Sequence, residues 1–363
     1  MWRMDMPATQ RQRKGRGAAS NDSGRFEPEK RVSFDDGWGT ADEKPAPLVT
    51  TLSVDATRTI IARNDSPDIG FDRSINPYRG CEHGCIYCYA RPSHAYLGLS
   101  PGLDFESRLF YKPQAAKLLV AELSKKGYSC LPLALGSNTD PYQPAERKLG
   151  ITRAILEVLR DFRHPVTIVT KSALIQRDVD LLGEMARDRL AMAAISVTTL
   201  DRRLARVMEP RAATPERRLE TIAALAAAGV PVSVMSAPMI PALNDSEMEQ
   251  ILERARAAGA SSAAYTLLRL PLELKGLFKE WLETHFPAKA AHVLSLVAQT
   301  HGGRLYDSTW SKRMTGTGPY AEVLRLRFER ACRRLGFNQR TTEGLDTSRF
   351  LPPPQKGDQL ALF

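Results

Sequence analysis

Three of the five cysteines of this 363-residue chain lie in the stretch Arg79-Gly80-Cys81-Glu82-His83-Gly84-Cys85-Ile86-Tyr87-Cys88-Tyr89-Ala90-Arg91. We call residues 79–91 the cysteine loop. Its Cys-x3-Cys-x2-Cys spacing supplies three thiolates within eight residues, at Cys81, Cys85 and Cys88. Three thiolates can hold three irons of a cubane iron–sulfur cluster, which leaves the fourth iron without a protein ligand. The spacing therefore predicts a [4Fe-4S] cluster with one iron open to a small molecule.

Two other uses of the cysteines compete with the cluster. The three thiolates could join His83 or His94 in a Cys3His zinc site, because zinc accepts that ligand set in a closed tetrahedron. Structural zinc more often uses paired Cys-x2-Cys knuckles, and the sequence has no second knuckle. A disulfide framework fits less well, since a chain of this length without a secretory segment is expected in the cytosol, where thiols stay reduced. We therefore favour the cluster.

The first part of the chain, residues 1–47, differs in composition from the rest. Basic residues alternate there with Gly, Ser, Gln and Asp without an apolar period, which predicts a disordered basic region. It lacks the apolar core of a signal peptide, and no run in the chain approaches the roughly 18 apolar residues of a membrane span. We expect a cytoplasmic protein that does not bind membranes.

Positive charge is concentrated towards the two ends of the chain. The net charge is +10 and the pI is near 9.4. Residues 1–34 contain eight Lys or Arg against four acids, and residues 304–349 contain ten against five. A basic surface favours polyanions such as nucleic acid, although many basic proteins merely have a solvated positive face.

Short apolar runs alternate with amphipathic segments through the middle of the chain. This pattern predicts right-handed βαβ units and a buried parallel sheet, with residues 57–62 as an edge strand. The predicted strands are 131–135, 165–169, 190–198, 230–236 and 262–268, and the helices before them fall near 112–126, 145–161, 176–187, 215–228 and 246–258.

Polar residues follow the predicted strands. The strand 131–135 runs into Gly136-Ser137-Asn138-Thr139, and the strand 165–169 runs into Thr170-Lys171-Ser172. In parallel βα barrels the reactive groups sit at the carboxyl ends of the strands. Lys171 would place a compact cation there, which suits a carboxylate. Turn chemistry explains any one such segment, but several strand ends in register with the cysteine loop favour a ligand site.

The cysteine spacing, with the aromatic Tyr87 just before the third cysteine, resembles the signature of the radical S-adenosylmethionine (radical SAM) superfamily. The resemblance implies an α/β fold, a partial (β/α)6 TIM-type barrel, here over residues 57–303. It also implies that the amino and carboxylate groups of SAM chelate the open iron. The cluster would then donate one electron, cleave the sulfonium bond and release a 5′-deoxyadenosyl radical.

The same resemblance assigns residues to the SAM site. Tyr87 would support the adenine, Lys171 would pair with the carboxylate of SAM, and Ser196 would contact the ribose. Ser137 offers its hydroxyl to the ligand. No residue is assigned as catalytic.

The segment Met208-Glu209-Pro210-Arg211 resembles the Glu-Pro-Arg segment of the branch that contains the spore photoproduct lyases. Glu209 and Arg211 could orient the cofactor, or they could form a structural ion pair. Pro215 suits the first turn of the following helix, with Thr214 as its N-cap. Residues 237–245 match the pattern that this branch uses near the methionine part of SAM.

The resemblance covers residues 57–340 and is greatest to bacterial radical SAM proteins that share Asn76-Pro-Tyr-Arg-Gly-Cys81 and His94-Ala-Tyr-Leu-Gly-Leu99. These are related to the spore photoproduct lyases at the level of the barrel. One departure matters, because the lyases use a cysteine as hydrogen donor where this sequence has Ser137. Cys130 lies too early on its strand to replace it. Cys332 falls in a predicted helix, where a buried inert thiol is expected.

Residues 304–340 are expected to form a helical extension. In the helix 320–335, Leu324, Phe328, Ala331 and Leu335 form an apolar stripe that would dock. Arg327, Arg330 and Arg334 form a basic stripe that would face out, as a solvated face or as a surface for a polyanion.

Residues 351–363 form a Pro-rich spacer followed by a short apolar tail. The order of Gln359, Leu360, Leu362 and Phe363 resembles the linear motif by which bacterial repair and replication proteins bind the DNA sliding clamp. In such motifs the Leu and Phe side chains fill an apolar pocket and the Gln bonds at its rim. The DNA sliding clamp is therefore an expected partner.

Together these features predict a cytoplasmic radical SAM enzyme that abstracts hydrogen from DNA or another nucleic acid, in repair or modification. A reductase would supply the electron. A second class of protein competes with the enzyme: a non-catalytic iron–sulfur or zinc protein, recruited to DNA by its basic surface and its tail. Lys171 and the polar strand ends favour the enzyme.

Overall fold

The computed structural model describes residues 14–31, 47–339 and 344–354. Its main feature is a seven-stranded sheet with the order β10-β9-β8-β7-β6-β3-β2. From β3 to β10 the neighbouring strands are parallel, and β2 runs antiparallel to β3 at one edge. The strands are β2 Ile61–Arg63, β3 Arg73–Ile75, β6 Leu133–Leu135, β7 Val166–Thr170, β8 Ala191–Ser196, β9 Val232–Met239 and β10 Ser262–Leu267.

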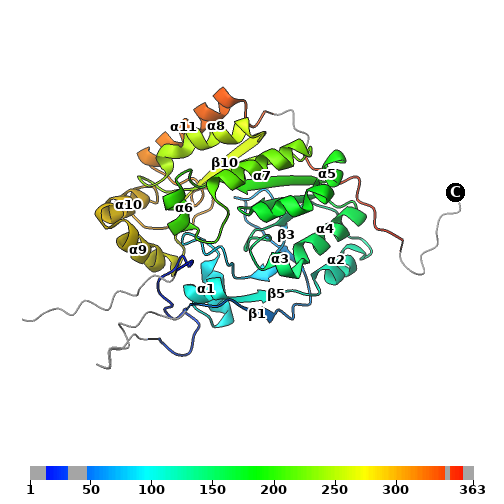
Figure 1. Cartoon of the computed structure of the whole chain (residues 1–363), viewed down its shortest axis with the longest axis horizontal. Helices are drawn as coiled ribbons and strands as arrows, with labels where there is room; N and C mark the ends of the chain where they lie inside the picture. Colours follow the sequence, from blue (N-terminus) through cyan, green and yellow to red (C-terminus); the bar gives the residue numbers. More distant parts are fainter. Residues whose placement is uncertain (1–13, 32–46, 340–343, 355–363) are drawn as a thin grey trace, which may run out of the picture.

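A helix precedes each parallel strand after β3, so six parallel strands follow one another in chain order. Figure 1 shows these helices on the outer side of the sheet. The arrangement confirms the predicted α/β fold with a partial (β/α)6 barrel, and an edge strand is present as β2, which overlaps only the end of the predicted 57–62. The helices are α2 Ala115–Leu123, α3 Glu146–Leu149, α4 Ile151–Asp161, α5 Val179–Arg187, α7 Pro215–Ala227 and α8 Met248–Ala257.

Local sequence explains how two of these helices begin. The segment predicted as one helix near 145–161 is divided at Gly150, whose left-handed backbone ends α3 and opens α4. Helix α7 begins as predicted: Thr214 Oγ1 accepts a hydrogen bond from the Arg217 amide at 3.5 Å, and Pro215 occupies the first turn.

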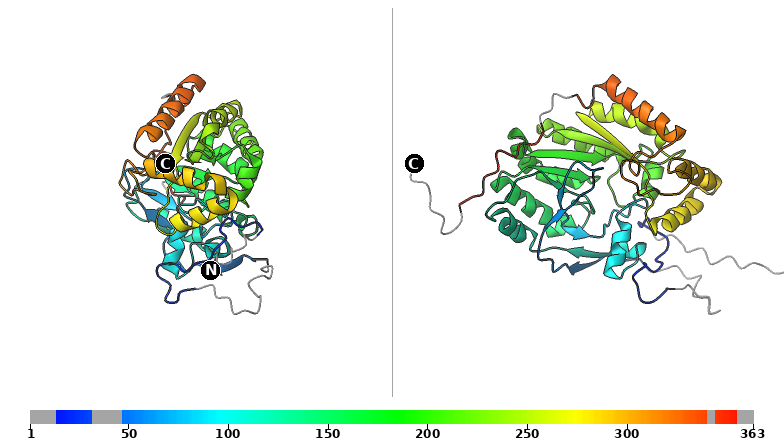
Figure 2. Two further views of the ribbon diagram at one scale, coloured as in Figure 1. Left: turned by 90° about the vertical axis from the view of Figure 1, so that its left-hand side faces the viewer. Right: turned by 180° about the vertical axis from the view of Figure 1, so that it is seen from behind.

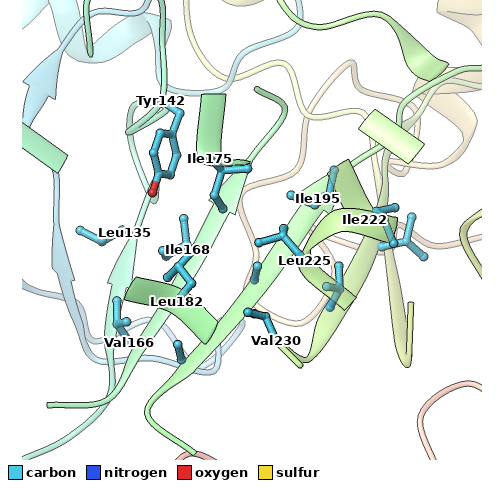
Figure 3. Packing of buried hydrophobic residues seen from close by; sticks show 14 of the residues in the cluster. Leu135, Tyr142, Val166, Ile168, Ile175, Leu182, Ile195, Ile222, Leu225 and Val230 are labelled. Carbon is cyan, nitrogen blue, oxygen red and sulfur yellow. The ribbon is translucent and has the colours of Figure 1, made fainter. Parts of the chain in front are cut away.

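The core lies between the sheet and its helices. Figure 3 shows Leu135, Ile168 and Ile195 of the strands packed near Leu182 of α5 and Leu225 of α7. All five side chains are buried, and full burial of such a side chain contributes about 1.5–3 kcal/mol. This packing fixes the positions of the strand ends.

A second, small sheet holds the start of the cysteine loop and was not predicted. Its order is β1-β5-β4, with β1 Thr51–Val54, β5 Arg108–Tyr111 and β4 Tyr78–Arg79. Strand β4 leads directly into Cys81, and the loop continues into a 3-10 helix over Arg91–Leu97 and then α1 Leu103–Ser107.

Further helices surround the barrel: α6 Arg202–Met208, α9 Leu274–His285, α10 Pro287–Gln299 and α11 Pro319–Leu335. Figure 2 shows α9 and α10 as a neighbouring pair and α11 beside α8. Helix α9 packs towards the cysteine loop, since Phe278 and Trp281 share one apolar cluster with Ile86.

Helix α11 confirms the predicted helix at 320–335, and its Leu324 and Ala331 are buried. The prediction that its basic stripe faces out holds for Arg330 and Arg334, which are exposed, whereas Arg327 is half-buried. Arg327 pairs with Glu249 of α8 at 2.6 Å, and Arg334 pairs with Glu253. The acidic residues of α8 therefore neutralise much of the surface that we expected to attract a polyanion.

Residues 14–31, part of the predicted disordered region, instead pack against the domain. The buried carboxylate of Glu106 accepts hydrogen bonds from the backbone amides of Gly17 at 2.9 Å and Ala18 at 2.8 Å. Arg16 is also buried and donates to the Leu48 carbonyl at 2.7 Å. This segment needs no apolar period, because polar contacts of its backbone and of side chains such as Arg16 hold it.

The described part of the carboxyl-terminal region, residues 344–354, lies at the amino ends of the strands. The Leu351 amide donates to the Phe162 carbonyl, and the Asp346 amide donates to the Arg189 carbonyl, both at 3.0 Å. Phe162 and Arg189 come shortly before β7 and β8. The predicted clamp motif, Gln359 to Phe363, lies outside the described residues. Within the described ranges, no helix is both long enough and apolar enough to cross a membrane.

Candidate cluster and cofactor site

The cysteine loop lies at the carboxyl ends of the parallel strands. The Glu82 amide donates to the side chain of Gln143, which follows β6, and the Ile86 amide donates to the Met208 carbonyl beyond β8. Three successive turns shape the loop: the amides of Gly84, Cys88 and Arg91 donate to the carbonyls of Cys81, Cys85 and Cys88 at 3.3, 3.2 and 3.1 Å. The three cysteines are free thiols, with Cys81 and Cys85 buried and Cys88 half-buried. Each of the three cysteines therefore lies at the start of a different turn of the loop.

A buried ion pair supports the loop from behind. The Arg91 guanidinium pairs with Glu106 and donates to the carbonyls of Cys85 at 2.9 Å and Gly84 at 3.0 Å. Gly84 has a φ of +66°, and a Cβ at this position would lie 2.6 Å from a carboxylate oxygen of Glu106. Glycine is therefore required there by both conformation and space.

The two histidines proposed as a fourth zinc ligand have other neighbours. His94 Nε2 lies 2.9 Å from the Arg108 carbonyl, and its ring packs edge-on against Phe105. His83 Nδ1 lies 3.3 Å from an Asp140 oxygen without hydrogen-bond alignment. Over the described ranges, no three His, Cys, Asp or Glu side chains converge on a point that could hold a single ion. Because a cubane spreads three thiolates over three irons, the cysteines fit the cluster better than one zinc.

Burial favours the protonated form of the unligated Cys81 and Cys85 thiols. It raises the pKa of Cys81, with a smaller contribution from Asp140. Burial also raises the pKa of Cys85 to about 12, against a lowering effect of Lys171. Metal ligands must be thiolates, so loading of iron would release these protons.

Lys171 follows β7 and lies beside the cysteine loop, with its Nζ 5.9 Å from the centre of the Tyr87 ring. Burial lowers the pKa of the Lys171 ammonium, but the nearby Cys85, Glu209 and Asp140 outweigh burial and raise it above its usual value. Lys171 is therefore a charged cation at the carboxyl edge, as the sequence predicted.

Tyr87 is fixed by a buried hydrogen-bond network. Its hydroxyl donates to the Glu209 carboxylate and lies 3.2 Å from Thr198 Oγ1, which itself donates to Glu209 at 2.9 Å. Arg218 forms an ion pair with the same carboxylate. Burial raises the pKa of Glu209, but Arg218 and Lys171 outweigh it and hold the pKa at about 2. Glu209 is therefore ionised.

The ion pair between Glu209 and Arg211, one of the two alternatives that the sequence left open, does not form. Glu209 is buried and faces Tyr87, whereas Arg211 donates to Glu82 Oε1 at 2.8 Å. The Arg211 amide also donates to the His83 carbonyl at 3.3 Å. Arg211 therefore braces the cysteine loop from outside, and no contact tests its predicted role towards SAM.

Ser137 and Ser196 lie at the carboxyl edge as predicted. Ser137 Oγ accepts a hydrogen bond from Asn76 Nδ2 at 3.0 Å, and Asn76 Oδ1 accepts one from the Asn138 amide at 2.9 Å. Ser196 is the last residue of β8, and its carbonyl accepts from Arg218 Nη1 at 3.1 Å. The structure brings both serines to the edge that holds the cysteine loop, while their contacts with SAM stay a prediction.

Two residues of this site were missed from the sequence. Asp140 ties the end of β6 to the end of β7, since it accepts from Thr170 Oγ1 at 2.6 Å and from the Lys171 amide at 3.0 Å, and it faces His83 of the cysteine loop. The position of Asp140, an acidic residue directly after the polar segment that follows β6, could have indicated a role in the site. Arg218 lies in an ordinary helical pattern, and nothing local marks it as the partner of Glu209.

The fold and site together define a partial parallel βα barrel with a cluster-binding cysteine loop at its carboxyl edge. The family model described as the Radical SAM superfamily matches residues 75–255, from the end of β3 into α8. The chain belongs to the radical SAM superfamily.

Two sequence relatives each cover about 60% of this chain. A protein of Mycobacterium tuberculosis, named as uncharacterized, is 38% identical over 219 residues, which are 60% of this chain and 64% of that protein. A protein of Methanocaldococcus jannaschii, also named as uncharacterized, is 27% identical over 213 residues, 59% of this chain and 76% of its own length. The chain thus spans just under two thirds of the mycobacterial relative.

Among solved structures, a spore photoproduct lyase complexed with a dinucleoside spore photoproduct aligns with a TM-score of 0.56 and 16% identity, covering 79% of this chain and 80% of the lyase. A mutant of the lyase with bound AdoMet and the same kind of dinucleoside aligns with a TM-score of 0.55 and 14% identity over the same shares. At these identities the likeness shows a common fold.

Proposed function

We propose that this protein is a radical SAM enzyme, with a [4Fe-4S] cluster held by Cys81, Cys85 and Cys88. One observation carries the proposal: three free cysteines on consecutive turns lie beside a lysine that its anionic neighbours keep charged. A structural iron–sulfur or zinc protein has no use for such a lysine at the open side of its metal.

The residues around the loop can bind and orient SAM. The Lys171 ammonium would pair with the SAM carboxylate, and Tyr87, fixed through Glu209, would support the adenine. Ser196 would contact the ribose, Ser137 would offer its hydroxyl, and Arg211 would act by bracing the loop. When bound together, the cluster and SAM supply a 5′-deoxyadenosyl radical by one-electron cleavage of the sulfonium bond. The electron would come from a reductase.

We further propose a nucleic acid as the substrate, in DNA repair or modification. The net charge of +10 favours a polyanion. The shared fold with a lyase that was solved with a dinucleoside is in keeping with this choice. We do not extend the lyase reaction to this protein, because Ser137 stands where the lyases are expected to carry a cysteine.

The DNA sliding clamp is the proposed partner. The support is the order of Gln359, Leu360, Leu362 and Phe363, together with the position of the preceding segment. Residues 344–354 lie at the amino ends of the strands, so a partner bound beyond them need not cover the cysteine loop.

The decisive test is whether the anaerobically reconstituted protein cleaves SAM reductively. A cluster protein of the non-catalytic class would hold iron without forming 5′-deoxyadenosine. A zinc protein would hold one zinc and show no absorbance from an iron–sulfur cluster.

A further inference from the structure

The open side of the partial barrel is spanned by residues 309–316, which we call the strap. At one end, the Leu267 amide of β10 donates to the Met314 carbonyl at 2.8 Å. At the other end, the Ser311 amide donates to Asp68 Oδ1 at 2.6 Å, and Arg313 pairs with the same carboxylate. Asp68 lies between β2 and β3. The strap therefore joins the edge strand β10 to the connection between β2 and β3 at the other edge of the sheet.

Arg269 lies where the strap meets the cysteine loop. It comes two residues after β10, and its Cζ lies 4.3 Å from the centre of the Tyr89 ring. Its Nη1 lies 3.2 Å from the Met314 sulfur of the strap. Tyr89 directly follows Cys88, so this guanidinium is held close to a proposed ligand of the cluster.

Arg269 differs from the other buried or partly buried arginines near the site. Arg211 pairs with Glu82, Arg218 with Glu209 and Arg313 with Asp68. In the described part of the chain, no carboxylate oxygen lies within salt-bridge distance of the Arg269 guanidinium, which is itself partly buried. Asp68, which pairs directly with Arg313, interacts with Arg269 only from a longer distance. A guanidinium that is partly removed from water without a directly paired anion is costly, so this position favours an anion from outside the protein.

Tyr89 presents an open aromatic surface beside this guanidinium. Its hydroxyl donates to the Ser137 carbonyl, which fixes the ring, yet the residue remains 46% exposed. Lys171 lies on the inner side, where Glu209 and Asp140 act on its charge. The two cations therefore have different surroundings, because carboxylates act on Lys171 whereas the direct neighbours of Arg269 are the Tyr89 ring and the Met314 sulfur.

We propose that Arg269 and Tyr89 form the substrate-positioning site of this protein, and that they bind one strand of a nucleic acid. The planar fork of Arg269 would hold a phosphodiester, and the exposed surface of Tyr89 would meet the adjacent base. The aromatic surface beside the guanidinium favours a nucleotide over a simple carboxylate. This inference rests on the proposed function and names its substrate class.

The test measures binding of a fluorescein-labelled single-stranded DNA oligonucleotide to the full reconstituted chain under anaerobic conditions. We expect Arg269→Ala and Arg269→Gln each to raise the Kd by about 10- to 100-fold, the range for loss of a charge-assisted bond. The slope of log Kd against log salt should also fall by about 0.7, the loss of one phosphate contact. Arg269→Lys should keep the slope and lose part of the affinity.

A matched control separates this site from net charge. Arg160→Ala removes the same charge at the carboxyl end of α4, where the arginine pairs with its neighbour Asp161. Its Kd should stay within twofold of the wild type. Iron content and thermal midpoint show that each variant is folded, and Arg269→Gln keeps a polar, though shorter, side chain if the alanine variant is unstable.

The outcomes separate this inference from the proposed function. If the wild type forms 5′-deoxyadenosine but does not bind the oligonucleotide, this inference is overturned and the enzyme class stands. Equal affinity and equal salt slopes for the wild type and both neutral Arg269 variants would also overturn it. If Arg160→Ala weakened oligonucleotide binding as much as the Arg269 variants do, net charge alone would explain the effect, and the proposed site would likewise be contradicted.

Discussion

The guanidinium of Arg218 and the carboxylate of Glu209 form an ion pair whose side chains are 2% and 0% exposed. The same guanidinium donates to the carbonyls of Ser196 at 3.1 Å and Ala213 at 2.8 Å. Glu209 in turn accepts from the hydroxyl of Tyr87. One arginine of α7 thus connects the end of β8 to the tyrosine between two cysteines.

Loss of Arg218 should therefore destabilise the protein strongly. Arg218→Ala leaves the Glu209 carboxylate buried without its cation, which costs about 3–5 kcal/mol of unfolding free energy. Urea denaturation measures this. Arg217→Ala is the matched control, because Arg217 is 62% exposed and pairs with Glu220, and its loss should change the free energy by at most about 1 kcal/mol. If the two substitutions lowered the free energy of unfolding by similar amounts, the proposed structural role of the buried Arg218–Glu209 pair would be contradicted.

The cysteines divide into two groups with different expected effects. Anaerobic reconstitution should give about four irons and four sulfides per chain. Alanine at Cys81, Cys85 or Cys88 should abolish the cluster, whereas Cys130→Ala and Cys332→Ala should retain it. Burial raises the pKa of both Cys130 and Cys332 to about 11, which fits unreactive thiols. Metal analysis and visible absorbance measure whether each variant holds the cluster. A single tightly held zinc in the wild type would argue against the cluster.

Lys171 should affect SAM without affecting iron. If its ammonium pairs with the SAM carboxylate, Lys171→Ala should weaken SAM binding by about 1.5–3 kcal/mol, as for a charge-assisted hydrogen bond. Equilibrium dialysis with labelled SAM measures the affinity, and iron analysis should show an intact cluster. Lys148→Ala, at an exposed position of α3, is the control. An unchanged affinity would exclude Lys171 from the SAM site.

The tail should bind the sliding clamp with modest affinity. Binding has to order about five residues at roughly 1–2 kcal/mol each, and only burial of Leu360, Leu362 and Phe363 can offset this cost. We therefore expect a micromolar Kd that depends on these side chains more than on salt.

Deletion of residues 359–363 should abolish clamp binding and leave the cluster and SAM cleavage intact. Asp358→Ala serves as a control outside the motif. The proposal fails if a peptide ending in Gln-Leu-Ala-Leu-Phe does not bind the clamp at high micromolar concentration, as measured by calorimetry.

The parts of the fold that depend on local pattern could be predicted from the sequence. The alternation of apolar runs and amphipathic helices predicted the parallel sheet, and the parallel arrangement then placed Lys171 beside the cysteine loop. Both steps use periodicity and the rule that carboxyl ends of parallel strands meet. Spacing alone was sufficient to single out Cys81, Cys85 and Cys88.

The parts that depend on distant partners could not be predicted. Glu209 pairs with Arg218 and not with Arg211, although Arg211 is nearer in the sequence. After α6 the Glu209 side chain points inward and the Arg211 side chain points outward to Glu82. The small sheet pairs strands of two to four residues from separate segments, which is too short for a pattern. Gly17 and Ala18 dock through backbone amides on Glu106, so their side chains carry no signal.

The most direct test of the central claim is the formation of 5′-deoxyadenosine by the anaerobically reconstituted protein, supplied with SAM and dithionite and measured by chromatography. The account predicts that the wild type and Cys130→Ala form this product, while Cys88→Ala forms none. A wild-type protein that holds four irons and binds SAM but forms no 5′-deoxyadenosine, with or without damaged DNA, would contradict it.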